Sequence, residues 1–151
     1  MFDLRDLYQQ VIVDHNKSPR NFGKLAAFNH EADGYNPLCG DRLHVYLKVG
    51  DDGLIEDVSF EGEGCAISVA SASLMTESMK GRSVAEFDKL FEGFQHMVTS
   101  DLGEEPDEEH LGKLAVLSGV REFPSRIKCA ILCWHTMKSA VKGEKVVAKT
   151  E

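Results

Sequence analysis

The fold class of this chain follows from the stretch Leu43-His44-Val45-Tyr46-Leu47-Lys48-Val49. Apolar residues alternate along it with polar or amphipathic ones, which predicts a strand that buries one face. A tight turn, Asp51-Asp52-Gly53, comes next, and the segment from Ile55 to Phe60 is expected to return as a second strand. The centre of the chain is therefore predicted to be an antiparallel hairpin.

Helices are predicted on both sides of this hairpin. The first begins with a cap at Asp3 and continues to about His15, and Ser18-Pro19 ends it. A loop and a polar segment then lead to Tyr35. The later helices are expected over residues 65–80, from the capping box of Ser83 and Glu86 onward, over 109–117 and over 124–141, with an acidic, solvated loop between 99 and 109.

These elements predict an α+β fold in which a small, mainly antiparallel sheet packs against helices. The length of 151 residues suits one ordinary domain, and the sequence contains neither an internal repeat nor a linker to a second domain. We therefore expect residues 1–151 to form a single domain, with a flexible C-terminal tail from about Lys142.

Charge and composition restrict the function. The 17 Lys and Arg residues face 25 Asp and Glu residues, and the net charge of -8 argues against nucleic acid as a partner. No apolar run approaches the roughly 18 residues of a membrane span, and the N-terminus has acids where a secretory signal would be basic and apolar. We therefore expect a cytoplasmic protein with no membrane partner, whose four cysteines stay out of disulfides.

Cys39-Gly40-Asp41 is the first candidate for metal chemistry, on a loop just before the predicted strand. In an extended chain, residues two apart face the same side, and Gly40 lets the backbone bend around a bound atom. The thiolate of Cys39 and the carboxylate of Asp41 can therefore both reach one metal ion.

Cys65 and Cys129 are each expected near the beginning of a helix, where the helix dipole favours a thiolate. Three thiolates and one carboxylate from three separated segments fit a tetrahedral zinc site, and their charge equally suits an oxidised two-iron cluster. Lys128 is a poor ligand but a good electrostatic partner for a thiolate or persulfide. No two cysteines have CxxC spacing, so the sequence pattern alone leaves buried free thiols as an alternative.

Four blocks of sequence resemble a known family. The chain is similar to the U-type iron–sulfur cluster assembly proteins, the IscU/NifU N-terminal family, along nearly its whole length. The resemblance implies the IscU/SufU-like sandwich of sheet and helices, and it places the family's three cysteines and its aspartate on Cys39, Cys65, Cys129 and Asp41. The matching blocks are residues 14–23 (DHNKSPRNFG), 36–41 (NPLCGD), 62–68 (GEGCAIS) and 71–73 (SAS).

Two departures indicate the SufU-like branch of the family. Lys128 stands where the scaffold proteins of the family have a histidine, and an extra segment at about 93–117 lengthens the gap between Cys65 and Cys129. The stretch 120–129 resembles SufU, and it lacks the proline-paired chaperone motif of the scaffold branch. Handover by a chaperone is therefore not expected here.

Kinship with SufU implies a zinc-containing sulfur acceptor, a sulfurtransferase-type partner of a SufS-like cysteine desulfurase rather than a stand-alone enzyme. Cys39 would take the persulfide sulfur with electrostatic support from Lys128, and zinc would sit on Cys39, Asp41, Cys65 and Cys129. A downstream cluster scaffold or an apo-protein would then receive the sulfur. Two alternatives remain: a scaffold that assembles a transient [2Fe-2S] cluster on the three cysteines, and a domain whose zinc only holds the fold.

Cys133 is expected to be a buried, small apolar side chain. It lies one helical turn from Cys129, so a role as a second sulfur relay stays open.

The histidines and two arginines near these motifs receive no metal or catalytic role. His15 is expected to be packed on the first helix, His44 on the outer face of its strand, and His135 on the solvent side of the last helix. Arg121 and Arg126 are expected to be solvated cations.

Overall fold

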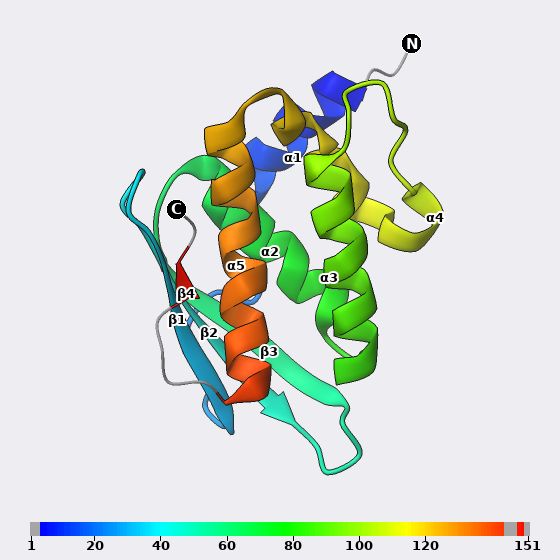
Figure 1. Ribbon diagram of the computed structural model, residues 1–151. Helices are drawn as coiled ribbons and strands as arrows, with labels where there is room; N and C mark the ends of the chain where they lie inside the picture. Colours follow the sequence, from blue (N-terminus) through cyan, green and yellow to red (C-terminus); the bar gives the residue numbers. More distant parts are fainter. Residues whose placement is uncertain (1–3, 144–147, 150–151) are drawn as a thin grey trace.

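The computed structural model describes residues 4–143 and 148–149 (Figure 1). No described helix is long and apolar enough to cross a membrane. The helices are α1 (Leu4–Lys17), α2 (Ala66–Met79), α3 (Val84–Thr99), α4 (Glu108–Leu111), the 3-10 helix η1 (Gly112–Glu122) and α5 (Pro124–Lys142). The strands are β1 (His30–Asn36), β2 (Asp41–Val49), β3 (Ile55–Glu63) and β4 (Ala148–Lys149).

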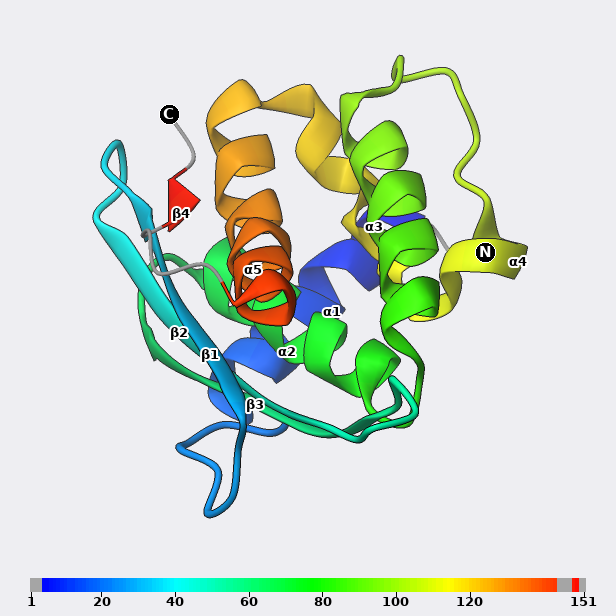
Figure 2. The same ribbon diagram turned by 60° about the horizontal axis from the view of Figure 1, so that its bottom comes forward.

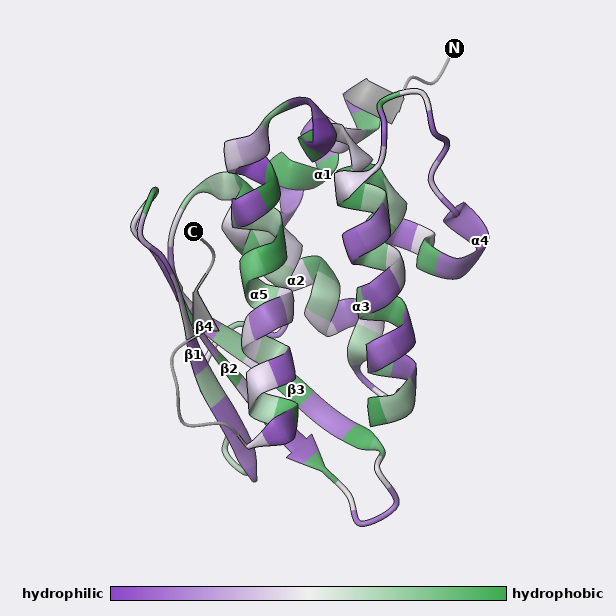
Figure 3. Cartoon of the chain, viewed as in Figure 1, coloured by the Kyte–Doolittle hydropathy of each residue, from purple (hydrophilic) through white to green (hydrophobic). Residues whose placement is uncertain are grey.

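The sheet has the order β3-β2-β1-β4, and β2 pairs antiparallel with both β3 and β1. The hairpin predicted from residues 43–60 is thus confirmed, as is the α+β fold class. Helices α2 and α5 pack on one face of the sheet, and α1, α3 and η1 pack against these two helices (Figures 1 and 2). One hydrophobic cluster draws on all five α-helices, η1 and β1 to β3, whereas hydrophilic residues line α3 and α4 on the side seen in Figure 3.

Strand β1 was not predicted, because its sequence HEADGYN has no β-branched residue. Its inward residues are instead small or amide-bearing: Ala32, Gly34 and Asn36 are buried. Helix α5 lies directly on them, and a Cβ added at Gly34 would lie 1.8 Å from Oγ1 of Thr136. Because α5 comes so close, the inward side of β1 needs such residues, and they do not give the sequence pattern by which a strand is recognised.

Two further sequence expectations differ from the structure. The helix expected at 109–117 is only one turn of α-helix, because Gly112 has a φ of 56° and the chain continues as the 3-10 helix η1. Ala148 and Lys149 pair in parallel with β1, so this part departs from the frayed tail expected beyond Lys142. Residues 144–147, 150–151 and the proposed cap at Asp3 lie outside the described residues.

The centre of the core is aromatic. Trp134 of α5 is fully buried and stacks on Phe94 at 4.8 Å and on Phe87 at 5.9 Å between ring centroids. His15 of α1 is also buried, as expected, and its Nδ1 lies 2.7 Å from Oγ of Ser73 in α2. Stacked rings and a satisfied polar contact therefore fix α5 and α1 against the rest of the core.

Replacing Gly34 by alanine is expected to lower the free energy of unfolding by about 2 kcal/mol, because the new methyl group overpacks against Thr136. The double variant G34A/T136A should regain part of this loss, since it removes the colliding hydroxyl. Gly103, with nothing within 4 Å of an added Cβ, supplies the control G103A. Urea unfolding of the four proteins tests this, and equal midpoints for G34A and G103A would contradict it.

Acidification is expected to destabilise the fold through its buried histidines. Burial lowers the pKa of His15 and of His135 below the ordinary histidine value. As the pH falls below about 6.5, the unfolded chain binds protons that the folded chain rejects, so the free energy of unfolding decreases. Denaturant titrations between about pH 7.5 and 5.5 should give a shallower decrease for His15→Asn than for the wild type; parallel curves would remove His15 from the effect.

Candidate metal centre

Three separate segments meet at one end of the sheet: the β1–β2 turn, the beginning of α2 and the first turns of α5. Cys39 on the turn is exposed, whereas Asp41 at the start of β2 and Cys129 on α5 are buried. One sulfur or oxygen atom of each lies within 4.8 Å of the others, as a shared metal ion would require. The Sγ atoms of Cys129 and Cys39 are 3.6 Å apart.

Cys65 completes the set of predicted residues from the N-terminus of α2. It is the N-cap residue, and its Sγ accepts a hydrogen bond from the backbone N–H of Ser68 at 3.4 Å. Asp41 links it to the other ligands: Oδ1 of Asp41 accepts from the backbone N–H of Cys65 at 2.8 Å, and Oδ2 lies 3.9 Å from Cys65 Sγ. The group within 4.8 Å is thus Cys39, Asp41 and Cys129, and Cys65 adjoins it through Asp41.

A buried asparagine that sequence reasoning missed holds the turn in place. Asn36 is fully buried, its Oδ1 accepts from the backbone N–H of Leu38 at 3.2 Å, and its Nδ2 lies 3.7 Å from Cys129 Sγ. The turn closes when the N–H of Gly40, at φ 72°, donates to the carbonyl of Asn36 at 2.8 Å. The signal available in the sequence was the pair Asn36-Pro37 shortly before Cys39.

Gly64 makes room for the carboxylate. A Cβ added at Gly64 would lie 2.5 Å from Oδ1 of Asp41, well inside van der Waals contact. The absence of a side chain before Cys65 therefore lets Asp41 reach the backbone N–H of that residue.

The thiols differ in their tendency to ionise. A hydrogen bond from Cys129 is the main cause that lowers the pKa of Cys65 to about 7, and the N–H of Ser68 acts in the same direction. The same contact with Cys65, together with burial, raises the pKa of Cys129. The contact between the two thiols therefore favours ionisation of Cys65 over ionisation of Cys129.

The donor set fits zinc. Three sulfur donors and one carboxylate match the ligands and the number that zinc prefers. Asp41 is fully buried, and within residues 4–143 and 148–149 no basic side chain forms an ion pair with it. A buried carboxylate is costly without a counter-charge, and a divalent cation on these four residues would supply one.

The remaining cysteine and the basic residue of the motif lie on α5. Lys128 is half-buried directly before Cys129. Cys133 is fully buried and its Sγ lies 3.4 Å from Oγ of Ser71. Burial raises the pKa of Cys133 to about 12, so it stays a thiol, and its expected burial is confirmed.

The expectations for His135 and Arg121 are wrong. His135 is half-buried with its ring 5.1 Å from that of Phe91, not on the solvent side of α5. Arg121 is not a free solvated cation, because its guanidinium donates to the carbonyls of Ser118, Asp101, Glu104 and Leu102 and to the hydroxyl of Ser100. These hydrogen bonds hold residues 100–104 against η1.

The other two expectations agree with the structure. His44 on β2 keeps its place on the outer face, where Nδ1 lies 2.5 Å from a carboxylate oxygen of Asp33. Arg126 is exposed and lies 4.3 Å from the ring centre of Phe123.

Comparison with known proteins identifies the family of the chain. A family model described as the NifU-like N-terminal domain matches residues 7–143. The chain belongs to this family. Among relatives of this NifU-like domain, the zinc-dependent sulfurtransferase SufU of Bacillus subtilis (strain 168) is 43% identical over 144 residues, which cover 95% of each chain. The resemblance to the IscU/NifU N-terminal family is therefore confirmed.

Scaffold proteins are also among the relatives of this NifU-like domain. The iron–sulfur cluster assembly scaffold protein IscU of Streptococcus pyogenes serotype M1 is 40% identical, over 92% of this chain and 85% of its own. A crystal structure from Fervidobacterium islandicum AW-1, described as a candidate iron–sulfur cluster assembly scaffold protein for the SUF system, superposes with a TM-score of 0.80 at 34% identity, over 91% of this chain and 98% of its own.

Replacing Gly64 by alanine is expected to weaken zinc binding by at least about tenfold, although Gly64 is not itself a ligand. The added methyl group would push Asp41 away from the N–H of Cys65. Competition with a zinc chelator measures the affinity, and circular dichroism confirms that the variant is folded. The control is G103A, and equal zinc affinity in G64A and G103A would contradict the role of Gly64.

Proposed function

We propose that this chain is a zinc-containing sulfur acceptor in cytoplasmic iron–sulfur cluster assembly, and that it receives sulfur from a cysteine desulfurase. The observation that carries the proposal is the difference in exposure within the centre. Cys39 is exposed on a turn, while Asp41 and Cys129 are buried beside it. A partner can therefore reach one thiol of the centre without entering the core.

Zinc is the proposed resident metal, held by Cys39, Asp41, Cys65 and Cys129. Bound there, it would keep the thiols as thiolates and would add no redox chemistry of its own. Two of the four are held by hydrogen bonds: Asp41 accepts from the N–H of Cys65, and Cys129 accepts from the amide of Asn36.

Sulfur transfer to Cys39 balances without an oxidant. The thiolate of Cys39 attacks the outer sulfur of the desulfurase persulfide and forms a new S–S bond. The S–S bond within the donor breaks, and its electron pair leaves with the donor cysteine as a thiolate. Lys128, one residue before Cys129, supports the resulting persulfide anion as a nearby positive charge.

The proposed role is that of a sulfurtransferase partner, not of a stand-alone enzyme. The donor would be a SufS-like desulfurase, as suggested by the 43% identity to a zinc-dependent sulfurtransferase. A downstream cluster scaffold or an apo-protein would receive the sulfur from Cys39.

A second candidate function is assembly of a [2Fe-2S] cluster as cargo on Cys39, Cys65 and Cys129. It is supported by the 40% identity to a scaffold protein. Lys128 argues against it, because a protonated lysine offers no lone pair to iron where the scaffold branch has a histidine.

Cys39→Ala is expected to abolish the stimulation of a SufS-class desulfurase, measured as alanine formed from cysteine. C133A should retain it, because Cys133 is sealed in the core. Full stimulation by C39A would refute the acceptor role of Cys39, and no stimulation by the wild-type protein would indicate that zinc only holds the fold.

Native mass spectrometry of anaerobically purified protein separates the two candidates. One zinc and no acid-labile sulfide per chain supports the sulfur acceptor, whereas two irons and two sulfides support the scaffold.

A further inference from the structure

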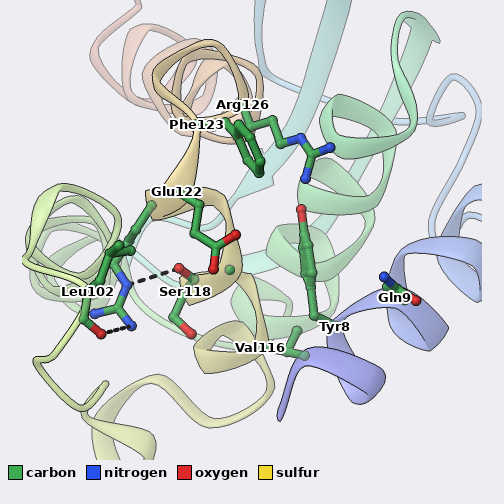
Figure 4. A pocket seen from close by; sticks show the side chains of 10 residues that line it. Tyr8, Gln9, Leu102, Val116, Ser118, Glu122, Phe123 and Arg126 are labelled. Atoms are coloured by element: carbon green, nitrogen blue, oxygen red, sulfur yellow. Dashed lines mark hydrogen bonds between the residues drawn. The ribbon is translucent and has the colours of Figure 1, made fainter. Parts of the chain in front are cut away.

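A hollow at the beginning of α5 has no role in the proposed function. Its volume is about 480 Å³, a size typical of sites for small molecules. It lies between α1, the segment around Leu102, η1 and the beginning of α5 (Figure 4). Apolar side chains form part of its wall, with Leu102 and Phe123 exposed on the rim.

A buried hydroxyl group without a partner points to a ligand here. Tyr8 of α1 is 8% exposed, and its hydroxyl forms no hydrogen bond with any described residue. Figure 4 shows this hydroxyl directed at the guanidinium of Arg126. Burial raises the pKa of Tyr8 above the ordinary tyrosine value, so the group keeps its proton and needs an acceptor.

Arg126 cannot be that acceptor, because a guanidinium only donates. Its side chain is exposed, rests on the ring of Phe123 and forms no ion pair with a residue in the described part of the chain. Arg126 can donate to the oxygen of Tyr8, and this contact opposes the effect of burial on the pKa of Tyr8. The hydroxyl proton of Tyr8 still has no acceptor among the described residues, and an oxyanion beside both side chains would supply one.

The charge of the hollow also favours an anion. Arg121 lines it as well, and the guanidinium of Arg121 is bonded to carbonyl and hydroxyl oxygens, which leave its positive charge in place. Two arginines thus line one hollow of a protein whose net charge is -8. Glu122 lines the hollow too and its negative charge acts on Tyr8, so an anion there depends on the guanidinium of Arg126.

We propose that this hollow binds a carboxylate borne on a small apolar body, with the carboxylate between Tyr8 and Arg126 and the apolar part against Phe123 and Leu102. A free carboxylic acid and an acidic side chain of a protein offer the same chemistry. The proposal stands independently of sulfur transfer, since none of these four residues belongs to the metal centre.

The test is a titration of the zinc-loaded, ¹⁵N-labelled full chain, followed by NMR. The probes are 3-phenylpropionate, its neutral analogue 3-phenylpropanamide, and the peptide acetyl-Phe-Glu-amide. We expect saturable shifts for residues that line the hollow, with the amide bound about tenfold more weakly than the acid. Tighter binding of the free acid identifies a small molecule as the source, and tighter binding of the peptide identifies a protein. Equal binding of acid and amide overturns the proposal, as does the absence of saturable binding by both carboxylates.

Two variants test the residues. Arg126→Gln should weaken binding of the acid about tenfold, while R82Q, at an exposed arginine on the segment before α3, should not change it. Tyr8→Phe should weaken binding and yet leave the melting temperature equal or higher, because the hydroxyl has no partner in the fold. Unchanged binding in both R126Q and Y8F overturns the assignment.

Discussion

The hydrogen bond from the N–H of Cys65 to Asp41 is the contact on which the centre depends. It joins the first residue of β2 to the N-terminus of α2, two elements separated by a hairpin and a loop. A carboxylate at a helix N-terminus is favoured by the free N–H groups and by the helix dipole. Without this contact, Oδ1 of the buried Asp41 would lack its hydrogen-bond donor, and burial of an unpaired carboxylate is costly. One interaction therefore joins the start of β2 to the N-terminus of α2 and places Asp41 beside Cys65.

Three glycines near Asp41 and Cys65 allow the chain to come as close as this contact requires. Gly64 admits the carboxylate, and Gly40 closes the turn that presents Cys39. Gly62 keeps the end of β3 against β2, where a Cβ would lie 2.1 Å from the carbonyl oxygen of Arg42. The segment around Cys65 therefore combines one thiol with two glycines because both the backbone and the carboxylate must come close.

The sequence predicted the hairpin and the helices α2, α3 and α5, because each has a local signal. The family resemblance singled out Cys39, Asp41 and Cys129, which the structure brings together, and Cys65 beside them. Alternation identifies β2, the capping box at Ser83 identifies α3 and is formed as expected, and the cysteines stand in recognisable motifs. Strand β1 and the roles of Asn36 and Arg121 could not be predicted in this way. They depend on contacts with α5, Cys129 and residues 100–104, which are distant in the chain, and such contacts leave no periodic pattern in the segment that makes them.

The four cysteines also differ in how far reagents can reach them, which gives the protein internal reporters of its own state. Cys39 is exposed and Cys65 half-exposed, while Cys129 and Cys133 are buried. Without a bound metal, an alkylating reagent would modify Cys39 and Cys65 before Cys129, since both can be reached and the pKa of Cys65 is lowered. Cys133 would react only after the core opens. The order of alkylation therefore separates loss of the metal from loss of the fold in a single mass spectrum.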